Sequence, residues 1–324
     1  MARDNRLDSV KGLLMILVVL GHVITVTDND NVFNHAVMGL IYVFHMPLFI
    51  LISGYLTKNP EQQRPQDMWR GVGNIFITLL IFHLISAFRS YLNTGSFFTA
   101  FLKFPYGILW YLMCLIYWRV ALYYTPKSLL RRPVLYLGLA LAVLLLCGLT
   151  RLGNTLALQR GLNFYFFFLL GYYFRQGAVN ARWWHSNILH IAMAVVLLPL
   201  IFWLYPHCGN IMNGADYYTL ADVPQKALIL ACSVAMSLIV FNNMREVKLM
   251  TLIGKESLFY YVYHFLVIVV LLLPIVHKYD LPVTLPFEIL YALAVLGVVF
   301  LMSKIKFFKW LVNPFKYKKK YSPQ

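Results

Sequence analysis

The sequence predicts an all-α integral membrane protein, folded as a bundle of about ten transmembrane helices. Of its 324 residues, 60% are hydrophobic and only 12% are charged, and the mean hydropathy is +0.68. A soluble domain carries roughly 25% charged residues, so this chain has too little polar surface to coat a water-soluble globule. Two further observations agree. Apolar runs of membrane-crossing length recur along the chain, and basic residues concentrate in alternate loops.

Apolar segments that are long enough, or nearly long enough, to cross a hydrocarbon core of roughly 30 Å lie along the whole chain. In chain order they are predicted near 12–27, 36–56, 71–92, 107–124, 133–150, 162–175, 187–205, 223–242, 253–276 and 283–303. The sixth is short for a crossing, so we expect it to be tilted, to lie in a thinned bilayer or to be partly re-entrant. The first is no cleavable signal, because another apolar run follows it at once.

The distribution of Lys and Arg predicts the orientation. If the N-terminus is cytoplasmic, most basic loops fall on that side, together with the basic tail 304–324. The opposite side receives only Arg89, Lys103, Arg151, Arg160 and Lys278. By the positive-inside rule both termini are then cytoplasmic, which requires an even number of crossings and agrees with ten. The tail is expected to act as a membrane-surface anchor.

Composition also narrows the partners. The net charge of +16 is spread over alternate loops, which makes it a topology signal and argues against nucleic acid as a partner. The four cysteines, Cys114, Cys147, Cys208 and Cys232, have no metal-type spacing, so we expect free thiols and no metal site. Membrane lipids are the expected surroundings, and the oligomeric state is left open.

Four histidines, His22, His45, His83 and His264, fall within predicted spans. An ionisable group at this depth is costly and therefore indicates function, although a neutral histidine bonded to a neighbouring helix is the structural alternative. His22 has the most informative surroundings, because Lys11 lies eleven residues before it. At about 100° per residue the two share one helix face and lie roughly 16 Å apart along the axis. A cation at the cytoplasmic mouth and a base at mid-depth suit an anionic cofactor with a long arm.

The other histidines differ in their neighbours. Pro47 follows His45, and a mid-span proline releases a backbone carbonyl and opens room for a polar site. Glu256, Tyr260 and His264 recur every four residues and are predicted to form a polar stripe on one helix face. His83 has no neighbours of these kinds, so we favour the structural alternative for it, a neutral histidine bonded to a neighbouring helix.

These residues carry a family resemblance. Arg6-x-Asp8-x-x-Lys11-Gly12, with an apolar run to Gly21-His22, resembles the first helix of the membrane-bound acyltransferase 3 family. Phe44-His45-Met46-Pro47-Leu48-Phe49, followed by Ser53-Gly54-Tyr55, is similar to the second-helix signature of members that resemble fucose 4-O-acetylases. Later landmarks match at Leu109-Trp110-Tyr111-Leu112, Phe168-Leu169-Leu170-Gly171-Tyr172 and Gly254-Lys255-x-Ser257-Leu258 with His264. The resemblance implies an acyltransferase-3-like transmembrane domain over residues 1–303.

The resemblance also implies an activity. It indicates a bacterial inner-membrane enzyme that moves an acyl group, most often acetyl, from acyl-CoA to a hydroxyl of a cell-surface glycan or lipid-linked sugar. Acyl-CoA is then a co-substrate, and no cofactor is bound permanently. His22 is expected to be the general base or a transient acyl carrier, and His45, Tyr260 and His264 to orient it or to stabilise the oxyanion.

Donor and acceptor contacts are less sharply indicated. Lys11 and Arg70 are expected to hold the CoA phosphates. The family often carries an Arg-x-x-Arg element before the third helix, whereas this chain has Arg64 and Arg70 there without that spacing. Trp110 and Tyr111 are candidates for stacking on a sugar, with ordinary interfacial aromatics as the alternative.

A proton-coupled transporter or flippase for a sugar-type substrate is the alternative function, because buried histidines suit that class too. Such folds often contain an internal repeat, and none is evident in the chain.

Overall fold

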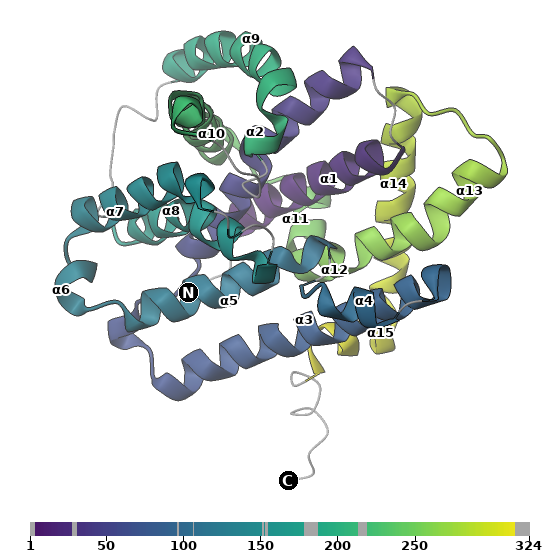
Figure 1. The fold of residues 1–324 in the computed structure, drawn as a ribbon, viewed down its shortest axis with the longest axis horizontal. Helices are drawn as coiled ribbons and strands as arrows, with labels where there is room; N and C mark the ends of the chain where they lie inside the picture. The colour runs from purple at the N-terminus through teal and green to yellow at the C-terminus, as the bar shows by residue number, and fades with distance from the viewer. Residues whose placement is uncertain are drawn as a thin grey trace. The chain divides into compact units, whose positions relative to one another are not determined.

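The structure is a computed structural model that describes residues 4–27, 31–95, 97–105, 107–150, 152, 155–177, 187–212 and 219–314. Across these residues every regular element is a helix. The chain divides into two compact units, which are described separately (Figure 1).

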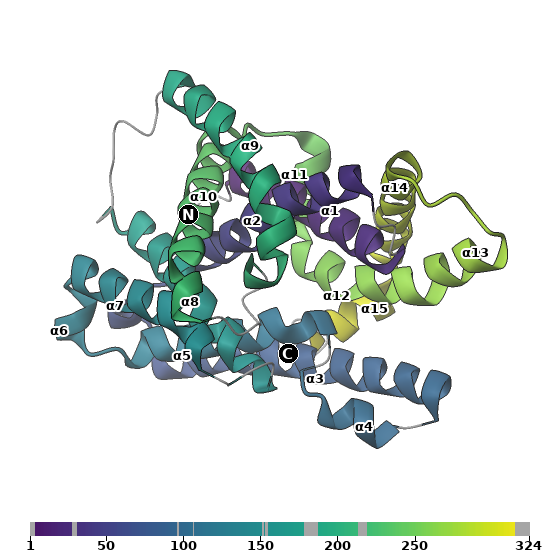
Figure 2. The same ribbon diagram turned by 45° about the horizontal axis from the view of Figure 1, so that its top comes forward.

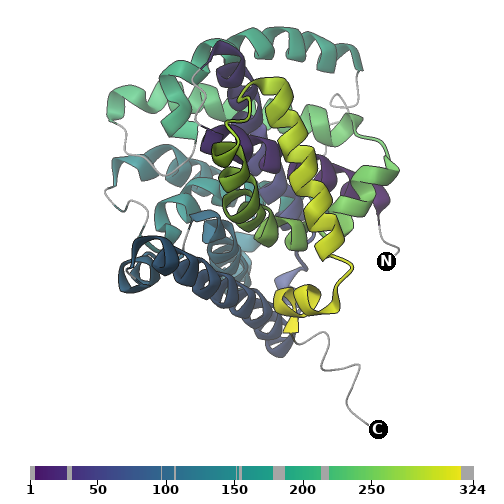
Figure 3. The ribbon, with the colours of Figure 1, turned by 90° about the vertical axis from the view of Figure 1, so that its right-hand side faces the viewer.

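Unit 1 comprises Met1–Ile52, Val179–Asn213 and Leu220–Lys304. Its helices are α1 (Asn5–Thr27), most of α2 (Val32–Tyr55), α9 (Asn187–Met212), α10 (Val223–Asn243), α11 (Lys248–Lys255), α12 (Ser257–Val267), α13 (Leu273–Lys278) and α14 (Leu285–Met302). Helix α1, from the N-terminal end of the sequence, packs against α11, α12 and α14, which come from its C-terminal part (Figure 2). Figure 3 shows α14 beside α12 from another side.

The crossing of α1 and α11 depends on two glycines. A Cβ at Gly12 would collide with the backbone of Met250, and one at Gly254 would collide with the backbone of Asp8. Small residues at a crossing let two backbones approach closely, which is a common way for membrane helices to pack. The Ser9 and Thr251 hydroxyls add a hydrogen bond of 2.7 Å at the same crossing. Helix α1 is therefore held at a defined position along α11.

Unit 2 comprises Ser53–Ala178, Gly214–Thr219 and Ile305–Gln324. After the end of α2 it contains α3 (Pro65–Thr94), α4 (Phe97–Leu102), α5 (Trp110–Tyr124), α6 (Lys127–Leu130), α7 (Pro133–Leu146), α8 (Leu158–Arg175) and α15 (Lys306–Val312). Helix α8 packs against α5 and α7 (Figure 1). The Arg175 guanidinium donates to the carbonyls of Tyr55 and Thr57, and so satisfies the open carbonyl end of α2.

The basic tail contributes a helix to unit 2. Helix α15 packs against α3, and the Thr78 hydroxyl donates to the Val312 carbonyl at 2.7 Å (Figure 3). This part of the tail is therefore packed on another helix as well as being suited to a membrane surface. Residues 315–324 lie outside the described residues.

Within the described residues, seven helices are long and apolar enough to cross a membrane. They are Asn5–Thr27, Phe33–Gln62, Pro65–Thr94, Gly107–Tyr124, Leu220–Asn243, Ser257–Lys278 and Leu285–Met302. Shorter apolar helices cover Pro133–Leu149 and Ile188–Leu204. The chain is thus a multi-pass, all-α membrane protein. The predicted sixth crossing corresponds to α8, which is in neither group, so the count of ten stays a prediction.

One predicted span is interrupted. The segment 253–276 was expected as a single helix, but the backbone leaves helical geometry at Glu256 (φ −115°, ψ 28°), between α11 and α12. Glu256 therefore stands at the N-cap of α12, where its main-chain carbonyl accepts from the Tyr260 N–H at 3.1 Å, while Tyr260 and His264 lie within the helix. Further along, Ile268–Leu272 form a π-helical segment, a feature that is often found near functional sites.

Candidate active site

His22 and His264 lie together in unit 1. His22 is half-buried on α1 and His264 is fully buried on α12. Their ring centroids are 5.3 Å apart with an interplanar angle of 35°, and Phe265 meets the His22 ring edge-on at 5.5 Å. The packing of α1 against α12 brings these two residues from opposite ends of the sequence side by side.

Hydrogen bonding determines which nitrogen of His264 is protonated. His264 Nδ1 lies 3.0 Å from the carbonyl oxygen of Tyr260, one turn earlier on α12. A carbonyl only accepts, so Nδ1 must carry the proton, and in the neutral ring Nε2 is left with its lone pair. Nε2 is buried and has no hydrogen-bond partner among the described residues. His264 thus offers an unused acceptor beside His22.

His45 on α2 has the same arrangement. Its Nδ1 donates to the Ile41 carbonyl at 2.6 Å, and the side chain is buried with Tyr42 packed edge-on against it at 5.2 Å. His45 and His264 both interact electrostatically with His22. The three histidines that the sequence singled out therefore form one cluster centred on His22. Among the described residues, no three His, Cys, Asp or Glu side chains are arranged to hold a metal ion.

Lys11 lies on α1 and is largely buried. Its ammonium is 2.7 Å from the Asp8 carboxylate, and the two side chains are 16% and 4% exposed. Asp8 is thus paired locally at this end of α1, one turn before Lys11. A ligand anion at Lys11 would therefore meet a cation that already has a carboxylate beside it.

Tyr260 is buried on α12, and its main-chain carbonyl is the group that orients His264. Tyr260 and His264 therefore lie on the same helix, as predicted.

The remaining predicted contacts lie in unit 2. Tyr111 is buried on α5 and its hydroxyl is 2.6 Å from that of Ser53. Trp110 stacks on Phe164 at 5.6 Å and lies under the Arg160 guanidinium at 5.0 Å. Both aromatics are thus packed within the unit. Arg70 is exposed on α3.

His83 fits a structural role. It is fully buried on α3, its Nε2 is 3.0 Å from the Phe101 carbonyl, and Phe104 packs edge-on against the ring at 4.7 Å. These contacts join α3 to α4 and to the segment that follows it.

Some ionisable residues within spans were not singled out by sequence patterns. Glu288 on α14 is fully buried, and its Oε1 accepts hydrogen bonds from Thr27 at 2.7 Å and Asn34 at 3.2 Å. Its Oε2 is buried without a hydrogen-bond partner in the described part of the chain. Lys226 on α10 is 4% exposed, and Arg119 on α5 is half-buried. The sequence signal that could have identified these three residues is their position within predicted spans, because charged side chains within a span usually mark function.

Comparison with known proteins agrees with the resemblance of the motifs. The family model Acyl_transf_3, described as an acyltransferase domain, matches residues 4–304. Nodulation protein NolL of Sinorhizobium fredii is 43% identical over 82 residues, which are 24% of this chain and 22% of that protein. Nodulation protein NolL of Mesorhizobium japonicum is 35% identical over 82 residues, which are 24% of this chain and 21% of that protein. The matched segment is thus about a fifth of each relative's length. No solved structure gives a significant match.

Proposed function

The chain belongs to the Acyl_transf_3 family of acyltransferase domains, and from this we propose that it is a membrane-bound O-acyltransferase. It moves an acyl group, most simply acetyl, from acyl-CoA to a hydroxyl of a cell-surface polysaccharide or lipid-linked sugar. The observation that carries the proposal is the packing of His264 against His22, with rings 5.3 Å apart, inside the segment that the family model covers.

The reaction needs a base because a sugar hydroxyl is a weak nucleophile. In the proposed step His22 removes the hydroxyl proton while the oxygen attacks the thioester carbonyl carbon. The carbon–sulfur bond then breaks, and the CoA sulfur leaves and takes up a proton. In a two-step version His22 itself carries the acyl group before the sugar receives it.

The hydrogen bonds of His264 favour an orienting role for that residue. Because Nδ1 already donates to Tyr260, Nε2 of the neutral ring accepts, and an N–H of His22 is the donor that it suits. A hydrogen bond of this kind, formed when substrate binds, would orient the His22 ring toward the hydroxyl, as an orienting partner does for a catalytic histidine. His45, with its Nδ1 bonded to Ile41, suits the same task from α2.

Donor and acceptor contacts are proposed at the residues that the sequence singled out. Lys11 and Arg70 are proposed to bind the CoA phosphates, and Trp110, Tyr111 and Tyr260 to contact the sugar. Because Lys11 already pairs with Asp8, it contributes less net charge at its site than a free lysine would.

We further propose that the protein resides in a bacterial inner membrane with ten crossings and both termini in the cytoplasm. The basic loops and tail support this orientation. It places the start of α1, with Lys11, on the side where acyl-CoA is made.

The test is transfer of radiolabelled acetyl from acetyl-CoA to an isolated surface glycan by the purified chain. His22→Ala is expected to lower the rate by about 10²–10⁴-fold without loss of inserted protein. His277→Ala removes an exposed histidine outside the cluster and is the matched control. Undiminished acetyl transfer by His22→Ala would contradict the proposed mechanism. Uptake of a labelled sugar into vesicles without acyl-CoA would favour a carrier instead.

A further inference from the structure

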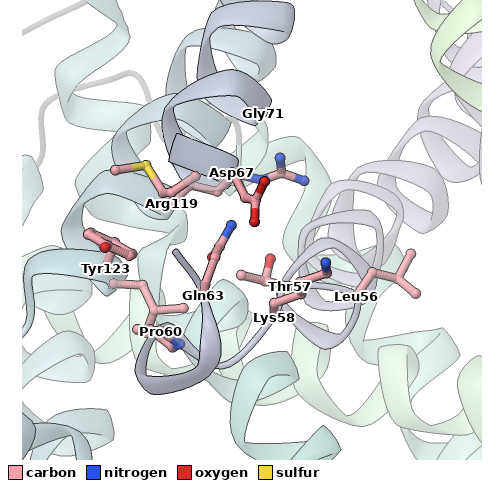
Figure 4. A pocket seen from close by; sticks show the side chains of 11 residues that line it. Leu56, Thr57, Lys58, Pro60, Gln63, Asp67, Gly71, Arg119 and Tyr123 are labelled. Carbon is pink, nitrogen blue, oxygen red and sulfur yellow. The ribbon is translucent and has the colours of Figure 1, made fainter. Parts of the chain in front are cut away.

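Unit 2 contains a polar cavity of about 220 Å³. It lies where α2 ends, α3 begins and α5 approaches its end. Figure 4 shows Lys58, Asp67 and Arg119 around it, with Gly71 and Tyr123 on its walls. The residues that line this cavity belong to unit 2, whereas the histidine cluster belongs to unit 1.

Arg119 is the residue that most needs explanation. It lies within the α5 span, is half-buried, and its Nε is buried without a hydrogen-bond partner. Over the described residues, no acidic side chain forms an ion pair with it. Removing a cation from water is costly unless an anion compensates it. An arginine that lines a cavity without an acidic partner from its own chain can bind an anion from outside the chain.

The surrounding charges reinforce this interpretation. Lys58 is an exposed cation on the same cavity. Asp67 is the acidic side chain of the lining, and Arg64 already binds it at 2.9 Å. Asp67 also interacts electrostatically with Lys58 and Arg70. One carboxylate is therefore surrounded by several cations, and the cavity keeps a positive excess.

Size and shape limit the occupant. Sites for drug-sized ligands run from roughly 300 to 1,000 Å³, so this smaller cavity suits one compact group. A Cβ at Gly71 would make ordinary contact with Arg119, 3.6 Å from its Nη1, so a longer side chain there would enter the space beside the guanidinium. A guanidinium binds phosphate oxygens through two parallel N–H groups, and a lysine adds a point charge.

We propose that this cavity binds a phosphate ester or diphosphate, held by Arg119 and Lys58. The phosphates of coenzyme A and the headgroup of an anionic phospholipid share this chemistry. Taking coenzyme A as the source rests on the proposed function, whereas the phosphate site itself does not. Arg119 is then the binding residue, and Gly71 keeps the cavity open for its ligand.

Binding measured without turnover tests the site independently of the transferase activity. The purified full chain in detergent is titrated with coenzyme A and with inorganic pyrophosphate by calorimetry. Arg119→Gln and Lys58→Gln are each expected to weaken binding of both probes by about tenfold or more. Lys127→Gln, which removes an exposed cation from a neighbouring helix, is expected to change neither Kd.

A second pair of variants leaves both cations in place. Gly71→Leu fills the cavity beside Arg119 and is expected to weaken binding as Arg119→Gln does. Gly73→Leu is its control on the same helix, because nothing lies within 4 Å of a Cβ at Gly73. This pair decides the question even where Arg119→Gln does not fold.

The source is identified by comparing nanodiscs of phosphatidylcholine with nanodiscs that also contain phosphatidylglycerol. Weaker binding of coenzyme A in the variants, with unchanged stabilisation by phosphatidylglycerol, supports the nucleotide. Lost stabilisation by phosphatidylglycerol, with an unchanged Kd for coenzyme A, supports the lipid headgroup. Unchanged affinity for every phosphate probe in Arg119→Gln and Gly71→Leu overturns the proposal. Tight pyrophosphate binding without any acyl transfer would leave this site standing and refute the proposed function alone.

Discussion

The rings of His22 and His264 lie 5.3 Å apart from centroid to centroid, and Nε2 of His264 is buried without a hydrogen-bond partner among the described residues, although the two residues belong to helices at opposite ends of the chain. Neither residue is catalytically informative by itself, because a lone buried histidine is often structural. Their pairing, with one ring oriented by a main-chain carbonyl, is an arrangement in which one histidine can position another.

His264→Phe tests this pairing. Phenylalanine keeps an aromatic ring against His22 and Phe265 but removes both nitrogens, so we expect a normal melting temperature and a kcat lowered by about tenfold or more. Initial rates across pH, with thermal unfolding of the same sample, provide the measurement. A wild-type rate and pH profile would show that His264 only fills space.

Gly12→Ala tests the α1–α11 crossing. The added Cβ meets the Met250 backbone, so the helices must separate, and overpacking of this kind costs about 1–3 kcal/mol. We expect a lower melting temperature and less inserted protein. Gly297→Ala on α14, where nothing lies within 4 Å of the new Cβ, should be neutral or slightly stabilising. Equal stability of the two variants would contradict the close approach.

Glu288 is expected to tolerate glutamine better than alanine. Glutamine keeps an oxygen that accepts from Thr27 and Asn34, whereas alanine removes a fully buried acceptor and costs about 1–3 kcal/mol. Thermal unfolding of the two variants in the same detergent measures the difference. If glutamine lowers stability as much as alanine does, the hydrogen bonds to Oε1 are not what holds Glu288.

A double-mutant cycle separates the two roles of Lys11. Removing either Lys11 or Asp8 leaves its partner charged and largely buried, so each single variant, Lys11→Gln or Asp8→Asn, should lower stability. The double variant should recover most of that loss. The KM for acetyl-CoA should nevertheless stay raised in the double variant if Lys11 binds the donor. Recovery of both quantities would assign Lys11 to folding alone.

Much of the architecture is predictable because membrane crossing requires long apolar runs: α14 coincides closely with its predicted span, and α1 and α3 contain theirs but begin about two turns earlier. The break in the helix at Glu256 was not predictable, because the composition of Gly254-Lys255-Glu256-Ser257 is compatible with a continuous helix. Helix α8 shows the reverse difficulty: it forms as a helix, but Arg160 and Arg175 at its ends make it a poor crossing by composition.

The site was predictable to a similar degree. Histidines at bilayer depth marked the cluster on α1, α2 and α12, while the distance between His22 and His264 depends on packing that no local pattern reveals. Arg119 and Glu288 carried the same signal of charge at depth, but neither belongs to a recognisable motif. Their importance emerges only from what surrounds them: a cavity for Arg119 and two hydrogen-bond donors for Glu288.

The continuity of α1 sets a length scale for the chemistry. Because Lys11 and His22 lie on this one helix and a helix does not stretch, the rise from Lys11 to His22 stays close to roughly 16 Å. A donor anchored by its phosphates near Lys11 must reach that far with its flexible arm before its thioester meets His22. The first helix would then select donors by the length of their flexible arm, in addition to any selection for the acyl group itself.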